Sequence, residues 1–110
     1  MAERIRIASI DDVEPGHGIE VVAAGRVIAL FNIEGEFHAL DGVCPHAGGP
    51  LGKGEVSGRQ VTCPWHGWQF DVTNGKHGLN PRLTHERFEI TVEGDDVLVE
   101  ISDGSNSDGI

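Results

Sequence analysis

The 110-residue chain has little of what defines several large protein classes. It contains two cysteines, one methionine and no tyrosine, and two cysteines are too few for a secreted domain held together by disulfides. Its longest apolar run is Val27 to Phe31, whereas a membrane-spanning helix needs about 20 apolar residues. The first ten residues lack the apolar stretch of a signal peptide. We therefore expect a cytoplasmic protein without a membrane segment.

Positive charge is also scarce. Eight Lys and Arg residues face 18 Asp and Glu residues, which gives a net charge of −10. Nucleic acid and anionic membrane surfaces would repel such a chain. A protein partner with a basic patch is compatible with this charge, because complementary surfaces speed the encounter of two proteins.

The abundant residue types favour β-structure. Val and Ile together number 20 against six Leu, and β-branched side chains suit strands better than helices. The 16 glycines suit tight turns. Short strands are predicted at residues 3–8, 19–24, 27–33, 36–40, 60–63, 68–72, 87–92 and 97–101, with turn signals at Glu34-Gly35, Asn74-Gly75 and Gly94-Asp95 and one helical turn within residues 9–18.

The last two predicted strands alternate in the way that a hairpin requires. Phe88, Ile90 and Val92 precede the Gly94-Asp95 turn, with polar residues between them. Val97, Val99 and Ile101 repeat the alternation after it. Because successive side chains of a strand point to opposite faces, this pattern predicts a hairpin with one buried face.

Residues 41–81 differ from the rest of the chain. They hold nine of the 16 glycines, four of the five prolines, both cysteines and both tryptophans. We predict an all-β protein with a single domain over residues 1–102. Its base is a small antiparallel β-sandwich or barrel, with a loop-rich insertion at about 41–81. The Gly-, Ser- and Asp-rich residues 103–110 are expected to be a disordered tail.

Two short motifs in this insertion carry metal-ligating residues. Cys44-Pro45-His46 is followed, after sixteen residues, by Cys63-Pro64-Trp65-His66. Two converging loops would bring two thiolates and two imidazoles together. A Cys44–Cys63 disulfide would leave both histidines unexplained. Structural zinc accepts these ligands but usually takes Cys-x2–4-Cys and His-x3–5-His spacings. The third interpretation is a [2Fe–2S] cluster with Cys ligands on one iron and His ligands on the other.

The order Cys-x-His, sixteen residues, Cys-x2-His-Gly resembles the signature of the Rieske family. The resemblance is close over residues 44–67, and the strand pattern extends it to about residues 3–101. It implies the Rieske fold and one [2Fe–2S] cluster, with Cys44 and Cys63 on one iron and His46 and His66 on the other. The resemblance also indicates residues around the cluster: Gly48, Gly49, Trp65, Gly67, Trp68 and Pro81.

These neighbours of the cluster have different expected roles. Gly48 and Gly49, with Gly52 and Gly54 after them, are expected to let backbone amides approach the sulfides. Trp65 lies between two ligands and is either packed or exposed to a partner. Trp68 is expected to pack with Phe70 beneath the cluster loops. Pro81 resembles the proline with which a third loop shields the cluster in this family. The remaining histidines, His17, His38, His77 and His85, are interpreted as surface or strand residues, with His77 near the insertion.

The chain departs from the Rieske proteins of respiratory complexes. Those proteins resemble Cys-Thr-His-Leu-Gly-Cys and Cys-Pro-Cys-His-Gly-Ser-x-Tyr. Here the corresponding positions hold Gly49, Trp65, Trp68 and Phe70, so the extra disulfide and both hydroxyl donors are missing. Fewer hydrogen bonds stabilise the reduced cluster less, and we expect a potential near the low end of the class, about −150 mV.

The resemblance is therefore to the soluble ferredoxin component of multicomponent aromatic-ring dioxygenases. It implies a monomeric one-electron carrier, not an enzyme and without catalytic residues. Its implied partners are a flavin-dependent ferredoxin reductase and a terminal ring-hydroxylating oxygenase. A small accessory subunit of nitrite-reductase type and a structural zinc module are the alternatives.

Overall fold

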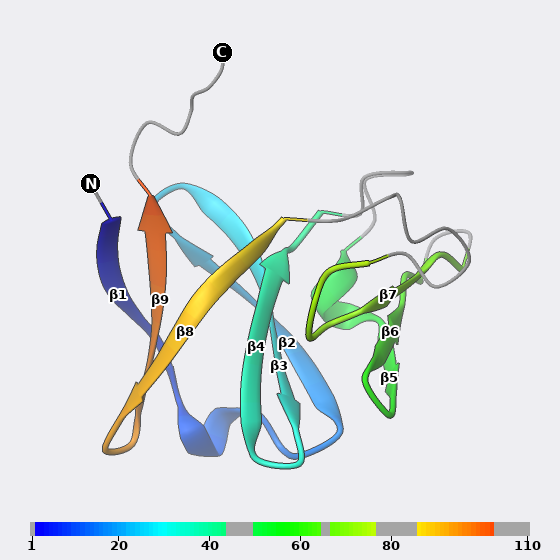
Figure 1. Ribbon diagram of the computed structural model, residues 1–110, viewed down its shortest axis with the longest axis horizontal. Coiled ribbons are helices and arrows are strands. Elements are labelled where there is room, and N and C mark those ends of the chain that lie inside the picture. Colours follow the sequence, from blue (N-terminus) through cyan, green and yellow to red (C-terminus); the bar gives the residue numbers. More distant parts are fainter. Residues whose placement is uncertain (1, 44–49, 65–66, 77–85, 103–110) are drawn as a thin grey trace.

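The computed structural model describes residues 2–43, 50–64, 67–76 and 86–102, and Figure 1 shows their arrangement. Most of these residues lie in strands, and among them there is no α-helix. The all-β prediction is confirmed. The larger of two antiparallel sheets has the order β1-β9-β8-β4-β3-β2. Its strands are β1 (Ala2–Ser9), β2 (His17–Ala23), β3 (Arg26–Ile33), β4 (Glu36–Asp41), β8 (Arg87–Glu93) and β9 (Asp96–Ser102).

This six-stranded sheet is strongly curled. Its two outer strands, β1 and β2, contact each other although they stand at opposite ends of the strand order. The sheet therefore forms the barrel-like base that the sequence predicts, as Figure 1 shows. A 3-10 turn, η1 (Ile10–Asp12), joins β1 to β2 where a helical turn is predicted. The Asp12 carboxylate accepts a 2.9 Å hydrogen bond from the Ser9 amide at its start.

The described part of the insertion forms the second sheet. A 3-10 turn, η2 (Leu51–Lys53), leads into β5 (Glu55–Ser57), which pairs with β6 (Gln60–Thr62), which pairs in turn with β7 (Gln69–Asp71). The sequence predicts β6 and β7 but misses β5. Three strand residues between Gly54 and Gly58 are too few for a visible alternation.

Two of the three predicted turns join paired strands. Glu34-Gly35 connects β3 to β4, and both residues have positive φ angles of 53° and 93°. Gly94-Asp95 connects β8 to β9. Asn74-Gly75 instead closes a turn directly after β7, where the Gly75 amide donates to the Asp71 carbonyl at 2.7 Å.

The predicted hairpin of β8 and β9 is confirmed with one exception. Val97, Val99 and Ile101 are buried on β9, and Phe88 is buried on β8. Val92 is 46% exposed, so the apolar face of β8 ends before that residue. Val92 lies in the second-last position of β8, where it still pairs with Val97 but its side chain is no longer covered.

Strand β3 is buried on both faces and separates two apolar cores. Ile28 and Leu30 pack with residues of β4, β8 and β9 in the first core. Ala29, Phe31 and Ile33 point to the second core, which also holds Leu40. The insertion supplies the other members of the second core: Leu51, Val61, Cys63, Phe70 and Val72. The insertion is thus fixed to the base through this shared core.

Candidate metal centre

The first motif starts from a closed base. Val43 and Pro50 form an antiparallel bridge, and the Leu51 amide donates to the Gly42 carbonyl at 2.9 Å. Gly42 in turn donates its amide to the Val27 carbonyl of β3 at 2.8 Å. A Cβ atom at Gly42 would lie only 2.6 Å from Val27 Cγ1, so a glycine is required for this close approach. The two ends of the first motif, Val43 and Pro50, therefore lie side by side just after β4.

The second motif also starts and ends at adjacent backbone positions. The Cys63 amide donates a 2.7 Å hydrogen bond to the Trp68 carbonyl, just beyond the paired strands β6 and β7. Gly67 has a φ angle of 74°, a backbone conformation that residues other than glycine rarely adopt. Cys63 itself is 1% exposed and belongs to the second core. Its thiol is thus presented from a buried, apolar position.

Most of the predicted ligands lie outside the described residues. Cys63 is described, whereas Cys44, His46 and His66 are not. Gly48, Gly49, Trp65 and Pro81 also fall outside the described ranges, as do His77 and His85. Among the described residues, no three Cys, His, Asp or Glu side chains gather in a way that could hold a metal ion. The four-ligand set therefore stays a prediction.

Comparison with protein families identifies the fold and its cofactor. The Rieske [2Fe-2S] domain family matches residues 3–101, nearly the whole described chain. This chain belongs to the Rieske family. The predicted fold and the predicted Rieske-type [2Fe–2S] cofactor are confirmed by this membership.

The curated relatives include proteins much longer than this chain and proteins of similar length. It is 37% identical over 97 residues to "Apoptosis-inducing factor 3" of Homo sapiens, covering 87% of this chain but only 16% of that protein. It is 39% identical over 77 residues to the ferredoxin component of the "Naphthalene 1,2-dioxygenase/salicylate 5-hydroxylase systems" of Ralstonia sp, covering 70% of this chain and 74% of that one. The chain thus spans less than a fifth of one relative and most of the other.

Solved structures give the same fold. The ferredoxin of carbazole 1,9a-dioxygenase from Nocardioides aromaticivorans IC177 superposes with a TM-score of 0.81 at 25% identity, covering 87% of this chain and 95% of that chain. A putative NADH-dependent nitrite reductase small subunit from Mycobacterium tuberculosis superposes with a TM-score of 0.85 at 24% identity, covering 94% and 98%. The second likeness concerns the fold alone.

The described residues fit the family's cluster. Cys63 offers a thiol, the soft donor that iron–sulfur clusters take, at the base of a closed turn. Gly67 follows the second predicted histidine and turns the chain back toward β7. Within the described ranges, no helix is both long and apolar enough to cross a membrane.

Trp68 and Phe70, predicted to lie beneath the cluster loops, pack against each other and against the second core. Phe70 is 1% exposed in the second core, and Trp68 packs against that core from its edge. Their ring centroids are 6.3 Å apart with an interplanar angle of 46°. These two residues stand where respiratory Rieske proteins carry Ser and Tyr, so both positions contribute apolar packing here and no hydroxyl group.

Gly52 and Gly54, predicted to let backbone amides approach the sulfides, lie instead where the insertion packs closely on other strands. The Gly54 amide donates to the Leu51 carbonyl at 3.0 Å, so it is not directed at a sulfide. A Cβ atom at Gly54 would collide with the Thr62 carbonyl, and one at Gly52 would lie 2.7 Å from the Ile19 carbonyl. Both glycines let the insertion pack closely on backbone, Gly52 on β2 and Gly54 on β6.

Two further histidines lie on strands, as interpreted from the sequence. His17 is exposed on β2, with its Nε2 3.9 Å from Glu14 Oε1. His38 is half-buried on β4, with its Nε2 3.5 Å from Glu36 Oε1. Neither contact is a hydrogen bond, and among the described residues the buried His38 Nε2 has no hydrogen-bond partner.

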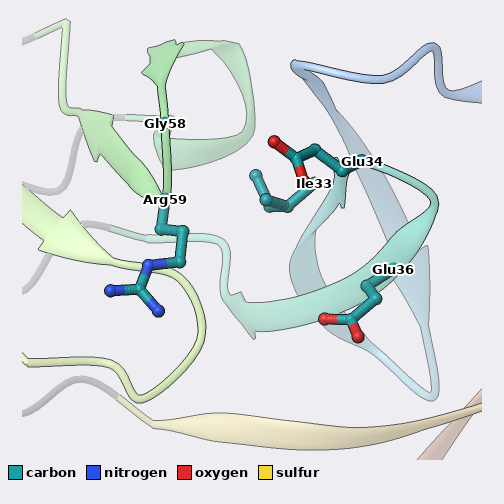
Figure 2. Close-up of a pocket in the computed structure, with 5 residues that line it drawn as sticks. All are labelled: Ile33, Glu34, Glu36, Gly58 and Arg59. Carbon is teal, nitrogen blue, oxygen red and sulfur yellow. The ribbon is translucent and has the colours of Figure 1, made fainter.

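One cavity of the described surface lies away from the two motifs. It has a volume of about 420 Å³ and is lined by Ile33, Glu34, Glu36, Gly58 and Arg59. Figure 2 shows the Arg59 and Glu36 side chains on opposite sides of it. Strand β4 begins at Glu36 beside this cavity and ends at Asp41 beside the base of the first motif. The cavity is thus at the other end of β4 from the candidate centre.

Sequence reasoning missed three charged residues at the start of the first motif. Arg26 begins β3, Asp41 ends β4, and Glu86 directly precedes β8, and these three side chains form one ion-pair network. No motif links them, because they are 15 and 60 residues apart along the chain. Only the register of β3, β4 and β8 brings them together.

Proposed function

We propose that this protein is a one-electron carrier of the dioxygenase-ferredoxin kind. It receives electrons from a flavin-dependent ferredoxin reductase and passes them to a terminal ring-hydroxylating oxygenase. The observation that supports this most directly is the Rieske family match over residues 3–101. The relatives named as ferredoxin components, which this chain matches over most of their length, support the same assignment.

We assign the cluster ligands as the sequence predicts them. Cys44 and Cys63 supply the thiolates to one iron, and His46 and His66 supply the imidazoles to the other. When bound, the cluster would supply one-electron transfer, a chemistry in which these residues hold the group and no bond of the protein is made or broken. The two thiolates balance the charge of two ferric ions and two sulfides, so the oxidised site is neutral. Placing a neutral site against the apolar second core requires less desolvation free energy than placing a charged site there.

The charge of the chain is divided unevenly between its two parts. Residues 42–85 contain two acids, Glu55 and Asp71, against four Lys and Arg residues, a net charge of +2. The remaining residues carry 16 acids against four Arg, a net charge of −12. The whole-chain charge of −10 predicts attraction to a basic patch, but the base carries that charge. We expect the partner surface that meets the insertion to be neutral or acidic, because a basic surface would be drawn to the base instead.

An accessory subunit of nitrite-reductase type is the second candidate. Its support is the structural likeness to a nitrite reductase small subunit, which concerns the fold. The genes beside this one discriminate the two candidates. Reductase and oxygenase subunits there favour the dioxygenase carrier, whereas subunits of a sirohaem reductase favour the accessory role.

Metal and electron content test the proposal on the purified protein. We expect a red-brown protein with about two iron and two sulfide per chain, reducible by one electron, by the Rieske formulation. The reductase and oxygenase encoded beside it should turn over only when the protein is added. A colourless protein with stoichiometric zinc would contradict the carrier, and turnover that does not depend on the protein would contradict its place between the two enzymes.

A further inference from the structure

Arg26 joins two separate parts of the chain at the end of the sheet that carries the first motif. Its Nη2 lies 3.1 Å from Asp41 Oδ2 and 2.8 Å from Glu86 Oε1, and its Nη1 lies 3.4 Å from Glu86 Oε2. The guanidinium carbon also lies 4.8 Å from the centre of the Phe88 ring. Bidentate pairing and stacking on a ring are contacts that the planar guanidinium makes better than an ammonium group. Arg26 is thus held from three sides.

One of the two carboxylates that Arg26 binds also anchors backbone beside the first motif. Asp41 Oδ1 accepts a 3.0 Å hydrogen bond from the amide of Val43, the residue before Cys44. The Asp41 amide donates to the Glu86 carbonyl at 2.9 Å, a backbone bond beside the paired strands β4 and β8. Arg26 therefore reaches the Val43 backbone through the Asp41 carboxylate.

We propose that Arg26 is a positioning residue for the cluster: together with Glu86 it holds Asp41, whose carboxylate fixes the backbone at Val43 before the first assigned ligand. The proposal rests on the ligand assignment made above. We call the three side chains Arg26, Asp41 and Glu86 the arginine clasp. The clasp fixes the backbone that enters the first ligand motif, so breaking it should speed the loss of the cluster.

The charges explain why one arginine has this effect. The Asp41 and Glu86 carboxylates share the same Nη2 atom, so they lie close enough to repel each other when the arginine is removed. The side chains of Arg26 and Asp41 are only 33% and 27% exposed, which weakens screening by salt. The hydrogen bond from Arg26 to Glu86 is the largest cause that raises the pKa of Arg26; burial opposes it, and the Coulombic attraction of Glu86 and the contacts with Asp41 add smaller increases. The guanidinium therefore keeps its charge.

Two substitutions that change local charge in opposite directions isolate the clasp. Arg26→Gln removes a positive charge beside the insertion, and Glu86→Gln removes a negative one. Reduction adds one negative charge, so R26Q should lower the potential and E86Q should raise it. Both variants break the clasp. Both should therefore shorten the half-life of the cluster's visible absorbance in air by about fivefold, the factor that corresponds to about 1 kcal/mol.

Arg6→Gln is the matched control. Arg6 lies on β1 and pairs with Asp96 through its Nε at 2.8 Å, away from both motifs. R6Q should leave the half-life and the potential as in the wild type. Exchange of the Val43 amide with deuterium, measured in the same three variants, should speed up in R26Q and E86Q alone.

The outcomes separate the clasp from the proposed function. Half-lives that are equal in R26Q, E86Q and R6Q would overturn the clasp, as would half-lives that shorten in one clasp variant and lengthen in the other, because those would follow charge alone. If R26Q does not fold, E86Q decides the question by itself. A wild-type protein without the cluster absorbance would overturn the ligand assignment, and the Val43 exchange rates would still decide whether the clasp holds that backbone.

Discussion

The amide of Cys63 donates a hydrogen bond of 2.7 Å to the carbonyl of Trp68 and closes the second motif into a short turn. The bond continues the β6–β7 ladder, in which Thr62 pairs with Gln69, by one step. Cys63 is consequently fixed by regular sheet pairing on one side and by the second core on the other. The backbone of the Cys63 position is therefore held on two sides.

Replacing this cysteine should remove the cluster and leave a folded protein. Cys63→Ser exchanges the soft thiolate for a hydroxyl, which is a poor ligand for an iron–sulfur centre. Thr62→Ser is the control: it also introduces a serine, one residue earlier on β6, but it leaves the Cys63 thiol in place and should keep the cluster. Iron and sulfide analysis with the visible spectrum measures both variants. Full iron content in C63S would contradict the assignment of Cys63 as a ligand.

Phe70 offers a test of how hydrogen bonding sets the potential. Phe70→Tyr restores the hydroxyl that respiratory Rieske proteins have at this position, and a donor near the cluster should stabilise the reduced form. We expect a higher potential by voltammetry. Phe37→Tyr is the control, because Phe37 packs against the first core and not the second. Equal potentials in F70Y, F37Y and the wild type would show that hydrogen bonding from position 70 does not control the potential.

The sequence predicted the base of the fold better than the insertion. In β8 and β9, alternating residues such as Phe88 and Val99 reveal both the strands and their buried face, because the chain folds back on itself within a few residues. The two-sided burial of β3 was visible only as the apolar run from Val27 to Phe31. Its division between two cores depends on what covers each face, and that is decided by residues far away in the chain.

The residues of the site that stand within one short motif could be predicted from the sequence. Those that meet only through the register of distant strands could not. Cys63 and Gly67 stand in a motif whose spacing is visible in the sequence, and Trp68 packs as its position beside the motif predicts. The role of Gly54 was predicted wrongly, because only the fold brings the Thr62 carbonyl against it. The clasp of Arg26 was missed for the same reason, since charges separated by 60 residues have no signature.

Gly54 should tolerate no side chain, although its backbone would accept one. Its φ angle of −74° is ordinary, so Gly54→Ala costs stability only through the collision of the new Cβ with the Thr62 carbonyl. We expect a loss of about 3 kcal/mol in the free energy of unfolding, at the upper end for overpacking. Gly58→Ala is the contrast: its φ angle is 60° and the space is open, which predicts a loss of about 1 kcal/mol. Urea unfolding of both variants measures the difference, and equal losses would remove the steric explanation.

Asn32 should be the polar residue on which the base depends most. It is 5% exposed, its Nδ2 donates to the Val13 carbonyl at 2.8 Å, and its Oδ1 accepts from the Gly35 amide at 2.8 Å. Asn32→Asp keeps the acceptor but places a carboxylate oxygen against the Val13 carbonyl, which leaves two buried acceptors facing each other. An unsatisfied buried group costs about 1–3 kcal/mol, and more when it is charged, so the free energy of unfolding should fall by about 3 kcal/mol.

The same change at an exposed asparagine provides the control for this last experiment. Asn74 Oδ1 accepts from the Lys76 amide at 2.8 Å in an exposed turn, and a carboxylate at that position can make the same bond. Asn74→Asp should therefore change the free energy of unfolding by less than about 0.5 kcal/mol. Because Asn32 packs in the base and not at the ligand motifs, N32D that still folds should bind the cluster with the potential of the wild type. A loss of stability as small as that of N74D would mean that the Val13 bond contributes nothing to the fold.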